Sequence, residues 1–222
     1  MEMLRLENIG YRYKNALRPT LDNVSCAFTA GTCHAIVGPS GSGKTTLLSI
    51  MAGLDSPQSG DIYLEGQNLK EMDLDQYRRE RISLIFQAFQ LFPLLTAIEN
   101  VCYAMELCGV SAKEAKERAA DLLEAVGIDQ SKHKRYPSNL SGGEQQRVAI
   151  ARALSGGGKI IFADEPTGNL DQENGDRVME ILYKLAREAG YCIIIVTHDL
   201  DIAAGADKVF RMKDGRLVEE GG

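Results

Sequence analysis

The chain has 222 residues, of which 44% are hydrophobic and 25% are charged, so its composition is that of a folded globular protein and excludes disordered, collagen-like and coiled-coil classes. The 25 Lys and Arg residues against 31 Asp and Glu residues give a net charge of −6. Broad nucleic-acid binding needs a basic face, so we expect no nucleic-acid partner.

Cysteine spacing and hydropathy limit the other classes. The five cysteines form no C-x-x-C pair, which argues against a zinc site and predicts small, buried, free thiols. The charged N-terminal residues do not fit a signal peptide. The uncharged run at 82–98 has 17 residues and contains Pro93, whereas a membrane span needs roughly 20 apolar residues. We therefore expect no membrane crossing.

In chain order, the first 35 residues predict short strands separated by turns. An apolar run at 34–37 leads into a glycine-rich loop, and a helical segment follows at 44–52. The segment 87–127 has a helical texture. Ser111 and Glu114 have the spacing of a capping box at the start of a helix that ends near Gly127.

Two strongly apolar runs, 160–163 and 192–196, flank a predicted helix over 172–189. Continuous apolar strands joined by a helix indicate a parallel sheet that is buried on both faces. Ligands bind such sheets at the carboxyl ends of the strands. The polar residues that follow each apolar run are therefore the candidates for chemistry.

The glycine-rich loop at 38–46 matches the pattern GxxxxGK[ST] between a strand and a helix. Its glycines let successive backbone amides point at phosphate oxygens. Lys44 would reach the β- and γ-phosphates, and the Thr45 hydroxyl would ligate Mg²⁺.

Asp164 and Glu165 end the apolar run at 160–163. Asp164 would hold Mg²⁺ directly or through water. Glu165, the next residue, would be the general base for an attacking water. His198 follows the second apolar run, and because its strand is expected beside that of Asp164, the imidazole would lie near a γ-phosphate.

The sequence LSGGEQQR at 140–147 opens another helical segment, which extends to about Ala153. Ser141 with Glu144 forms a second candidate capping box. A serine and two glycines at a helix N-terminus also make an anion site. The spacing alone leaves both interpretations open.

With these motifs in order, the whole chain resembles the nucleotide-binding subunit of ATP-binding cassette (ABC) transporters. The resemblance implies that Gln87 is the Q-loop glutamine, that His198 is the switch histidine and that 167–171 is the D-loop. It assigns adenine stacking to Tyr13, although Tyr11 lies one strand step away on the same face. Phosphate-binding positions are then assigned to Gly38, Ser40, Gly41, Gly43, Lys44, Thr45 and Thr46, with ATP and Mg²⁺ as cofactors and Thr45, Gln87 and Asp164 as metal ligands.

The family implies one ABC ATPase domain over 1–222. It has a P-loop NTPase core with a mostly parallel sheet and an N-terminal antiparallel β subdomain (1–87 and 156–222), and an inserted helical subdomain (88–155). Two copies pair head to tail, so that ATP lies between one phosphate loop and the other copy's Ser141, Gly142 and Gly143. Asp171 works across this interface.

Within the family, FQAFQLFPLLTAIENV at 86–101 and DEPTGNLD at 164–171 look most like the group that serves macrolide export, lipoprotein release and peptide-antibiotic resistance. This implies an integral membrane permease as partner and a cytoplasmic position on the inner face of the membrane. Two alternatives stay open, namely a mechanical switch on a membrane partner without transport, as in cell division, and a soluble cassette ATPase. A small-molecule P-loop kinase would not need the LSGGE sequence.

Overall fold

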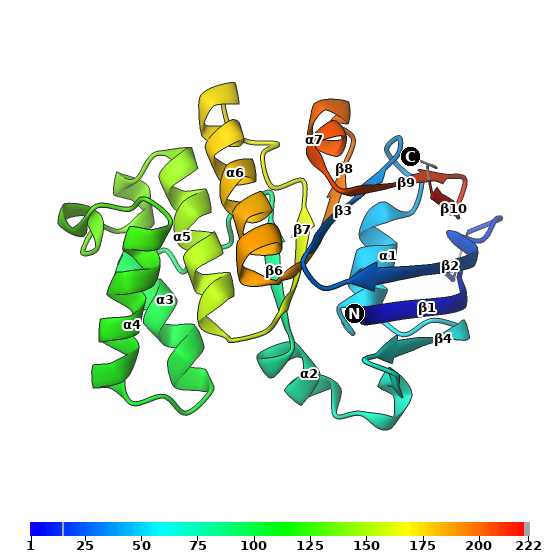
Figure 1. Cartoon of the computed structure of the whole chain (residues 1–222), viewed down its shortest axis with the longest axis horizontal. Coiled ribbons are helices and arrows are strands. Elements are labelled where there is room, and N and C mark those ends of the chain that lie inside the picture. Colours follow the sequence, from blue (N-terminus) through cyan, green and yellow to red (C-terminus); the bar gives the residue numbers. More distant parts are fainter. Residues whose placement is uncertain (15, 220–222) are drawn as a thin grey trace.

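The computed structural model describes residues 1–14 and 16–219. Two β-sheets and the helices around them form an α/β architecture, with helices α3, α4 and α5 gathered at one side and the N-terminal strands at the other (Figure 1). The predicted fold class is confirmed. The division at residues 88 and 155 into subdomains stays a prediction.

The larger sheet has six strands in the order β10-β9-β3-β8-β7-β6, and all neighbouring strands are parallel except β9 and β10. The strands are β3 (Thr32–Val37), β6 (Ile82–Phe86), β7 (Ile160–Asp164), β8 (Cys192–Thr197), β9 (Lys208–Lys213) and β10 (Arg216–Glu219). β8 is buried along its whole length and lies beside β7, as predicted for a sheet covered on both faces.

The register of this sheet aligns the strand ends. Asp164 pairs with Phe86 on one side and with Val196 on the other, and Val37 pairs with Thr197. The first residue after each strand therefore lies at one common edge of the sheet. These four residues are Gly38, Gln87, Glu165 and His198.

The smaller sheet is antiparallel and has the order β2-β1-β4-β5. It consists of β1 (Glu2–Tyr11), β2 (Leu21–Thr29), β4 (Ser59–Leu64) and β5 (Gln67–Asn68). Its buried residues share one core with helix α1 (Lys44–Met51) and with one face of the larger sheet. Helix α1, which follows the glycine-rich loop, is therefore packed against residues of both sheets.

The other face of the larger sheet is covered by helix α6 (Gln172–Ala189), which has the bounds that the sequence predicts. Val178, Leu182 and Ala186 lie on its buried face, at the spacing of an amphipathic helix. The short helices α2 (Leu74–Glu80) and α7 (Leu200–Gly205) complete the layer arrangement, together with 3₁₀ turns at Leu69–Glu71, Gln130–Lys132 and Pro137–Asn139.

Helices α3 (Ala97–Leu107), α4 (Ala112–Ala125) and α5 (Gly142–Ser155) pack on one another and on the α6 side of the sheet. Ser141 and Glu144 form the complete capping box that was predicted for α5. The box predicted at Ser111 is only half right. Ser111 accepts from the Glu114 amide, but the Glu114 side chain pairs with Arg118 instead of reaching back to the N-cap.

The cysteine prediction is correct in part. All five thiols are free, and Cys33, Cys102 and Cys192 are buried, but Cys108 is exposed. Among the residues that the structure describes, no helix is both long enough and apolar enough to cross a membrane.

A buried histidine lies on β3, in the strand that leads to the glycine-rich loop. His34 is fully buried beside the rings of Phe28 and Phe210, and its Nε2 accepts from the Thr29 amide at 3.0 Å. Burial lowers the pKa of His34 to about 4. The folded protein therefore holds this ring neutral in a pH range where an unfolded chain would protonate it.

This shift predicts acid sensitivity. Because the unfolded state binds the proton near pH 6.5 and the folded state only near pH 4, stability is complete above pH 6.5 and falls as the pH drops between these values. The loss should reach about 3 kcal/mol, since one pKa unit corresponds to about 1.4 kcal/mol. Urea unfolding at pH 7.5, 6 and 5 would measure it. His34→Gln keeps an acceptor for Thr29 and should flatten this dependence; an unchanged slope would contradict the assignment.

Candidate active site

The glycine-rich loop connects β3 to α1 and requires glycine for two different reasons. A side chain at Gly38 would lie 2.1 Å from the backbone oxygen of Met212, and one at Gly43 would lie 2.6 Å from that of Thr20. Gly41 has open space around it but a φ of +77°, in the left-handed region. The loop is thus packed against β9 and the end of the N-terminal segment, with its backbone close to the surface.

Lys44 begins α1 and folds back over this loop. Its Nζ donates to the backbone oxygens of Gly38 at 2.8 Å and Pro39 at 3.1 Å, and the residue is buried. The loop borders a cleft of about 820 Å³, which brings together most of the predicted site. The cleft is lined by Tyr13, Thr20, Pro39, Ser40, Gly41, Gly43, Lys44, Thr45, Thr46, Gln87, Glu165 and His198.

Glu165 is held by two neighbours at the end of β8. Its Oε2 accepts from the Thr197 hydroxyl at 3.0 Å, and its Oε1 lies 2.8 Å from His198 Nδ1. The Glu165 side chain is 18% exposed and that of His198 is 72% exposed. Glu165 also has a φ of +48°, unusual for a residue other than glycine. The carboxylate is therefore oriented while the imidazole stays open to the cleft.

Asp164, directly before it, carries a pKa above the ordinary range. Burial is the main cause and the neighbouring Glu165 adds to it, while the Thr45 hydroxyl and Lys44 oppose it. A cation bound close to Asp164 would favour the ionised form of its carboxyl group. Among the described residues no group of three or more His, Cys, Asp or Glu side chains could hold a metal ion. Thr45 and Asp164 instead offer a hydroxyl and a carboxylate, which fits Mg²⁺ bound jointly with phosphates.

Gln87 follows β6 and contacts the D-loop. Its Nε2 lies 3.4 Å from Asn169 Oδ1, and Asn169 Nδ2 donates to the backbone oxygen of Gln87 at 2.9 Å. A side chain at Gly168 would lie 2.6 Å from Gln87 Nε2, so any larger residue there would displace the end of the Gln87 side chain. The D-loop thus touches the glutamine that faces the phosphate cleft.

Tyr11 and Tyr13 differ in their surroundings. Tyr11 donates to Asp55 through its hydroxyl, a hydrogen bond that raises the pKa of Tyr11 to about 12. Tyr13 is 51% exposed, lines the cleft and lies 3.1 Å from the Thr46 hydroxyl. The two rings meet edge to face at 5.1 Å. Tyr13 is therefore the ring that is available to a nucleotide base.

The LSGGE segment lies elsewhere. Ser141, Gly142 and Gly143 begin α5 and are absent from the cleft lining, and α5 lies on the far side of β6 and β7 from α1 (Figure 1). Gly143 packs against Asn174 at the start of α6, where a side chain would lie 2.3 Å from Asn174 Oδ1. One copy of the chain does not bring this helix end to its own phosphate loop.

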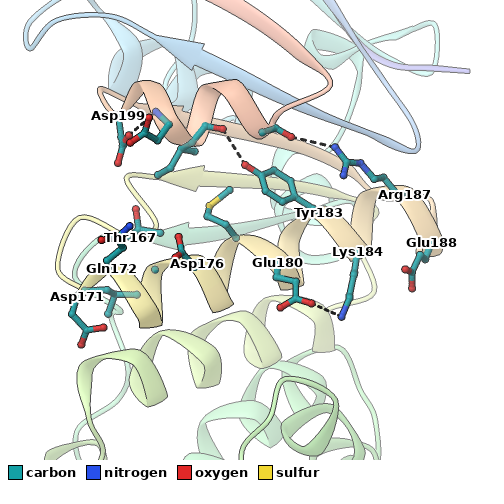
Figure 2. A pocket seen from close by; sticks show the side chains of 16 residues that line it. Thr167, Asp171, Gln172, Asp176, Glu180, Tyr183, Lys184, Arg187, Glu188 and Asp199 are labelled. Atoms are coloured by element: carbon teal, nitrogen blue, oxygen red, sulfur yellow. Dashed lines mark hydrogen bonds and ion pairs between the residues drawn. The ribbon is translucent and has the colours of Figure 1, made fainter.

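Asp171 caps α6. Its Oδ1 accepts from the Asn174 amide at 2.9 Å, and the hydrogen bonds from Asn174 lower the pKa of Asp171. It lies at one end of a groove of about 830 Å³ between α6 and α7, with Thr167 and Gln172 beside it (Figure 2). This groove contains no phosphate-loop residue and is separate from the cleft.

Two contributors to the site were missed by sequence reasoning. Thr197, which holds Glu165, ends the same apolar run that placed His198, so its position was a usable signal. Asn169 lies inside the D-loop motif, but its contact with Gln87 joins residues 82 positions apart and has no local signal.

Comparison with known proteins identifies the family. The ABC transporter family model matches residues 21–168. The chain belongs to this family. Together with the structural match below, this makes the chain an ABC ATPase.

Relatives match along nearly the whole chain. The ABC transporter ATP-binding protein YclH of Bacillus subtilis is 40% identical over 98% of this chain and 96% of its own length. The macrolide export ATP-binding/permease protein MacB of Mannheimia succiniciproducens is 46% identical over 90% of this chain, which corresponds to 31% of MacB. The ABC cassette MJ0796 of Methanocaldococcus jannaschii, solved as a dimer in a post-hydrolysis state with ADP and Pi, has a TM-score of 0.89, 38% identity and 98% coverage of both chains.

The tyrosine pair generates a test. Tyr13→Ala should weaken ATP binding about tenfold or more, because stacking of a base on an aromatic ring is worth roughly 1–3 kcal/mol. Tyr11→Phe keeps the ring that supports Tyr13 and should change affinity less than about twofold. Titration of each variant with ATP by calorimetry would measure both effects; an unchanged affinity of Tyr13→Ala for ATP would contradict the stacking role of Tyr13.

Proposed function

We propose that this chain is the ATP-hydrolysing subunit of a membrane transporter and that it drives a separate permease by ATP-dependent head-to-tail pairing with a second copy. The observation that carries this proposal is the incomplete cleft. It holds the phosphate loop, Glu165 and His198, whereas Ser141 and its glycines lie on another side of the molecule. The dimer of MJ0796 with ADP and Pi supports the same arrangement here.

In the proposed site the backbone of 38–46 binds the phosphates and Tyr13 stacks on adenine. Lys44 exchanges its contacts with Gly38 and Pro39 for the β- and γ-phosphates. Thr45 and Asp164 would hold Mg²⁺, with Gln87 close to them, and the ion would neutralise charge on the phosphates.

Hydrolysis then follows from the geometry around Glu165. A water attacks the γ-phosphorus and gives one proton to the carboxylate, and the bond to the bridging oxygen of ADP breaks. Thr197 and His198 fix the direction of the carboxylate before the reaction. The exposed side of His198 faces the cleft, so its Nε2 edge would lie near the γ-phosphate.

The second copy would close the cleft with the start of α5. In the single chain Ser141 caps this helix, with its hydroxyl 3.3 Å from the Glu144 amide. The same helix end carries the positive end of the helix dipole and free backbone amides. It is therefore suited to meet the γ-phosphate bound by the partner copy, while Asp171 lies in the D-loop that would cross the interface.

The dimer can be tested with the base removed. Glu165→Gln should bind ATP but hydrolyse it at least about 10²-fold more slowly, because the general base is lost. The uncleaved ATP should then hold two copies together, so light scattering with Mg-ATP should show the mass of a dimer. A monomer with bound ATP would contradict the proposal. Lys44→Ala in the same background should prevent both ATP binding and pairing.

Ser141 offers a matched pair of variants for the same assay. Asp and Asn are both good N-caps, so either should leave α5 folded. In the Glu165→Gln background, Ser141→Asp places a negative charge against the γ-phosphate and should abolish the ATP-dependent dimer. Ser141→Asn should weaken it far less. Equal dimerisation of both variants would contradict the placement of Ser141 and the LSGGE segment at the nucleotide site.

A surface near α3 suits a membrane partner. Phe92 and Tyr103 meet edge to face at 4.9 Å, and both are more than 40% exposed. Leu94 is 86% exposed and Leu107 is 61% exposed in the same helical region. Exposed apolar side chains that gather in this way mark an interaction site. We place the permease contact here, which would hold the chain at the inner face of the membrane.

The permease contact predicts a selective loss. Leu94→Glu together with Leu107→Glu should stop co-purification of the membrane partner from solubilised membranes and leave the ATPase activity intact, because both residues lie outside the cleft. Leu17→Glu is the matched control, since Leu17 is 99% exposed and lies beside residues of β9 and β10, not of α3. Retention of the partner by the double variant would contradict the placement.

The proposed transport group is export, lipoprotein release or antimicrobial-peptide resistance. The similarity to MacB, whose name joins an ATP-binding part to a permease, supports this group. Mass spectrometry of the co-purified partner separates the possibilities. A permease supports transport, a membrane partner of cell-wall enzymes supports the mechanical switch, and a soluble partner alone would contradict both.

A further inference from the structure

We propose that Asn169 is a positioning residue that fixes the orientation of the Gln87 side-chain amide, so that its oxygen is presented to the cation of the nucleotide site. The inference rests on the proposed function and concerns one contact between the D-loop and the end of β6. Its basis is the paired hydrogen bonding of the two amides and the close packing of Gly168 beneath them.

The amide of Gln87 has two ends of similar shape and opposite chemistry. The oxygen Oε1 can ligate a cation, whereas Nε2 carries only hydrogen-bond donors. A free glutamine at an exposed position can turn either end toward the cleft. Since Gln87 is exposed, burial does not select the orientation.

Asn169 contacts Gln87 at two points. Asn169 Nδ2 donates to the Gln87 backbone oxygen at 2.9 Å, and this bond leaves Asn169 Oδ1 directed at the Gln87 side chain. Only the Nε2 end of Gln87 can donate to that oxygen, and it lies 3.4 Å away. The opposite end, Oε1, is therefore turned away from the D-loop.

The backbone holds Asn169 in place for this contact. The backbone amide of Gly168 donates to the backbone oxygen of Glu165 at 3.1 Å, and that of Leu170 donates to the backbone oxygen of Thr167 at 2.9 Å. Residues 165–170 therefore form consecutive turns. Gly168 lets Gln87 pack against the turn, since a side chain there would lie 3.0 Å from Gln87 Cδ. Asn169 thus links the cation ligand to the turn that begins with the general base.

The test measures cation binding rather than turnover. Mn²⁺ replaces Mg²⁺ as a paramagnetic probe, and its affinity is measured by electron paramagnetic resonance with saturating AMP-PNP. Asn169→Ala should weaken Mn²⁺ binding about 3- to 10-fold, the range for loss of one or two exposed hydrogen bonds. Affinity for AMP-PNP without metal should stay unchanged. Gln172→Ala is the control, because it removes a side-chain amide from an exposed position three residues after Asn169. This variant should bind Mn²⁺ as the unaltered chain does.

A second background separates orientation from simple displacement of the D-loop. In Gln87→Glu both ends of the side chain are oxygens, so its orientation no longer matters. Asn169→Ala should then change Mn²⁺ affinity less than about twofold, which makes the two substitutions non-additive. An equal loss in both backgrounds, or no loss in the original one, would overturn the role of Asn169. If the unaltered chain bound Mn²⁺ and AMP-PNP no better than Lys44→Ala does, the proposed function itself would fail.

Discussion

The register of four parallel strands is the constraint on which the site depends. Because β6, β7, β8 and β3 are aligned at their carboxyl ends, the next residue of each strand reaches one edge of the sheet. That edge carries a metal-ligand candidate, a general-base candidate, the proposed switch histidine and the start of the phosphate loop. A slip of one residue would move every side chain of a strand to the opposite face. The apolar cores on both faces oppose such a slip, since each needs its own alternate set of side chains.

The second feature that organises the molecule is the set of polar contacts around the turn after β7. Gln146 of α5 donates to the Pro166 backbone oxygen at 2.7 Å, and Arg147 reaches Asn174 at 3.4 Å. Gln146 is fully buried, and its Oε1 has no hydrogen-bond partner among the described residues. The helix that begins with Ser141 is thereby joined to the turn that carries Glu165. In the proposed dimer, a displacement of the start of α5 would therefore shift the turn that carries Glu165 in the same chain.

Sequence reasoning succeeded where the signal is local and failed where it depends on tertiary packing. The glycine-rich loop, the apolar strands and α6 carry dense local patterns, and all of them were found. Two missed elements had usable signals, namely the Thr96–Glu99 capping box of α3 and the Asp214–Gly215 turn of the β9–β10 hairpin. The half-formed box at Ser111 shows the opposite case, because a partner four residues on competes for Glu114. Neither the Asn169 contact nor the exposure of Cys108 follows from spacing along the chain.

The central claim is that each nucleotide site is shared between two copies, and mixing two inactive variants tests it most directly. Lys44→Ala damages the phosphate loop and Ser141→Asp damages the LSGGE segment, here called the signature, so each variant alone should have almost no ATPase activity. In a mixed dimer, one site combines the intact phosphate loop of one copy with the intact signature of the other. Because neither variant pairs with itself, only mixed dimers should form, and complete mixed pairing would restore at most about half of the full turnover, since each mixed dimer carries one working site of two. Turnover no higher than the sum of the separate variants would show that both motifs act within one chain and would contradict the account.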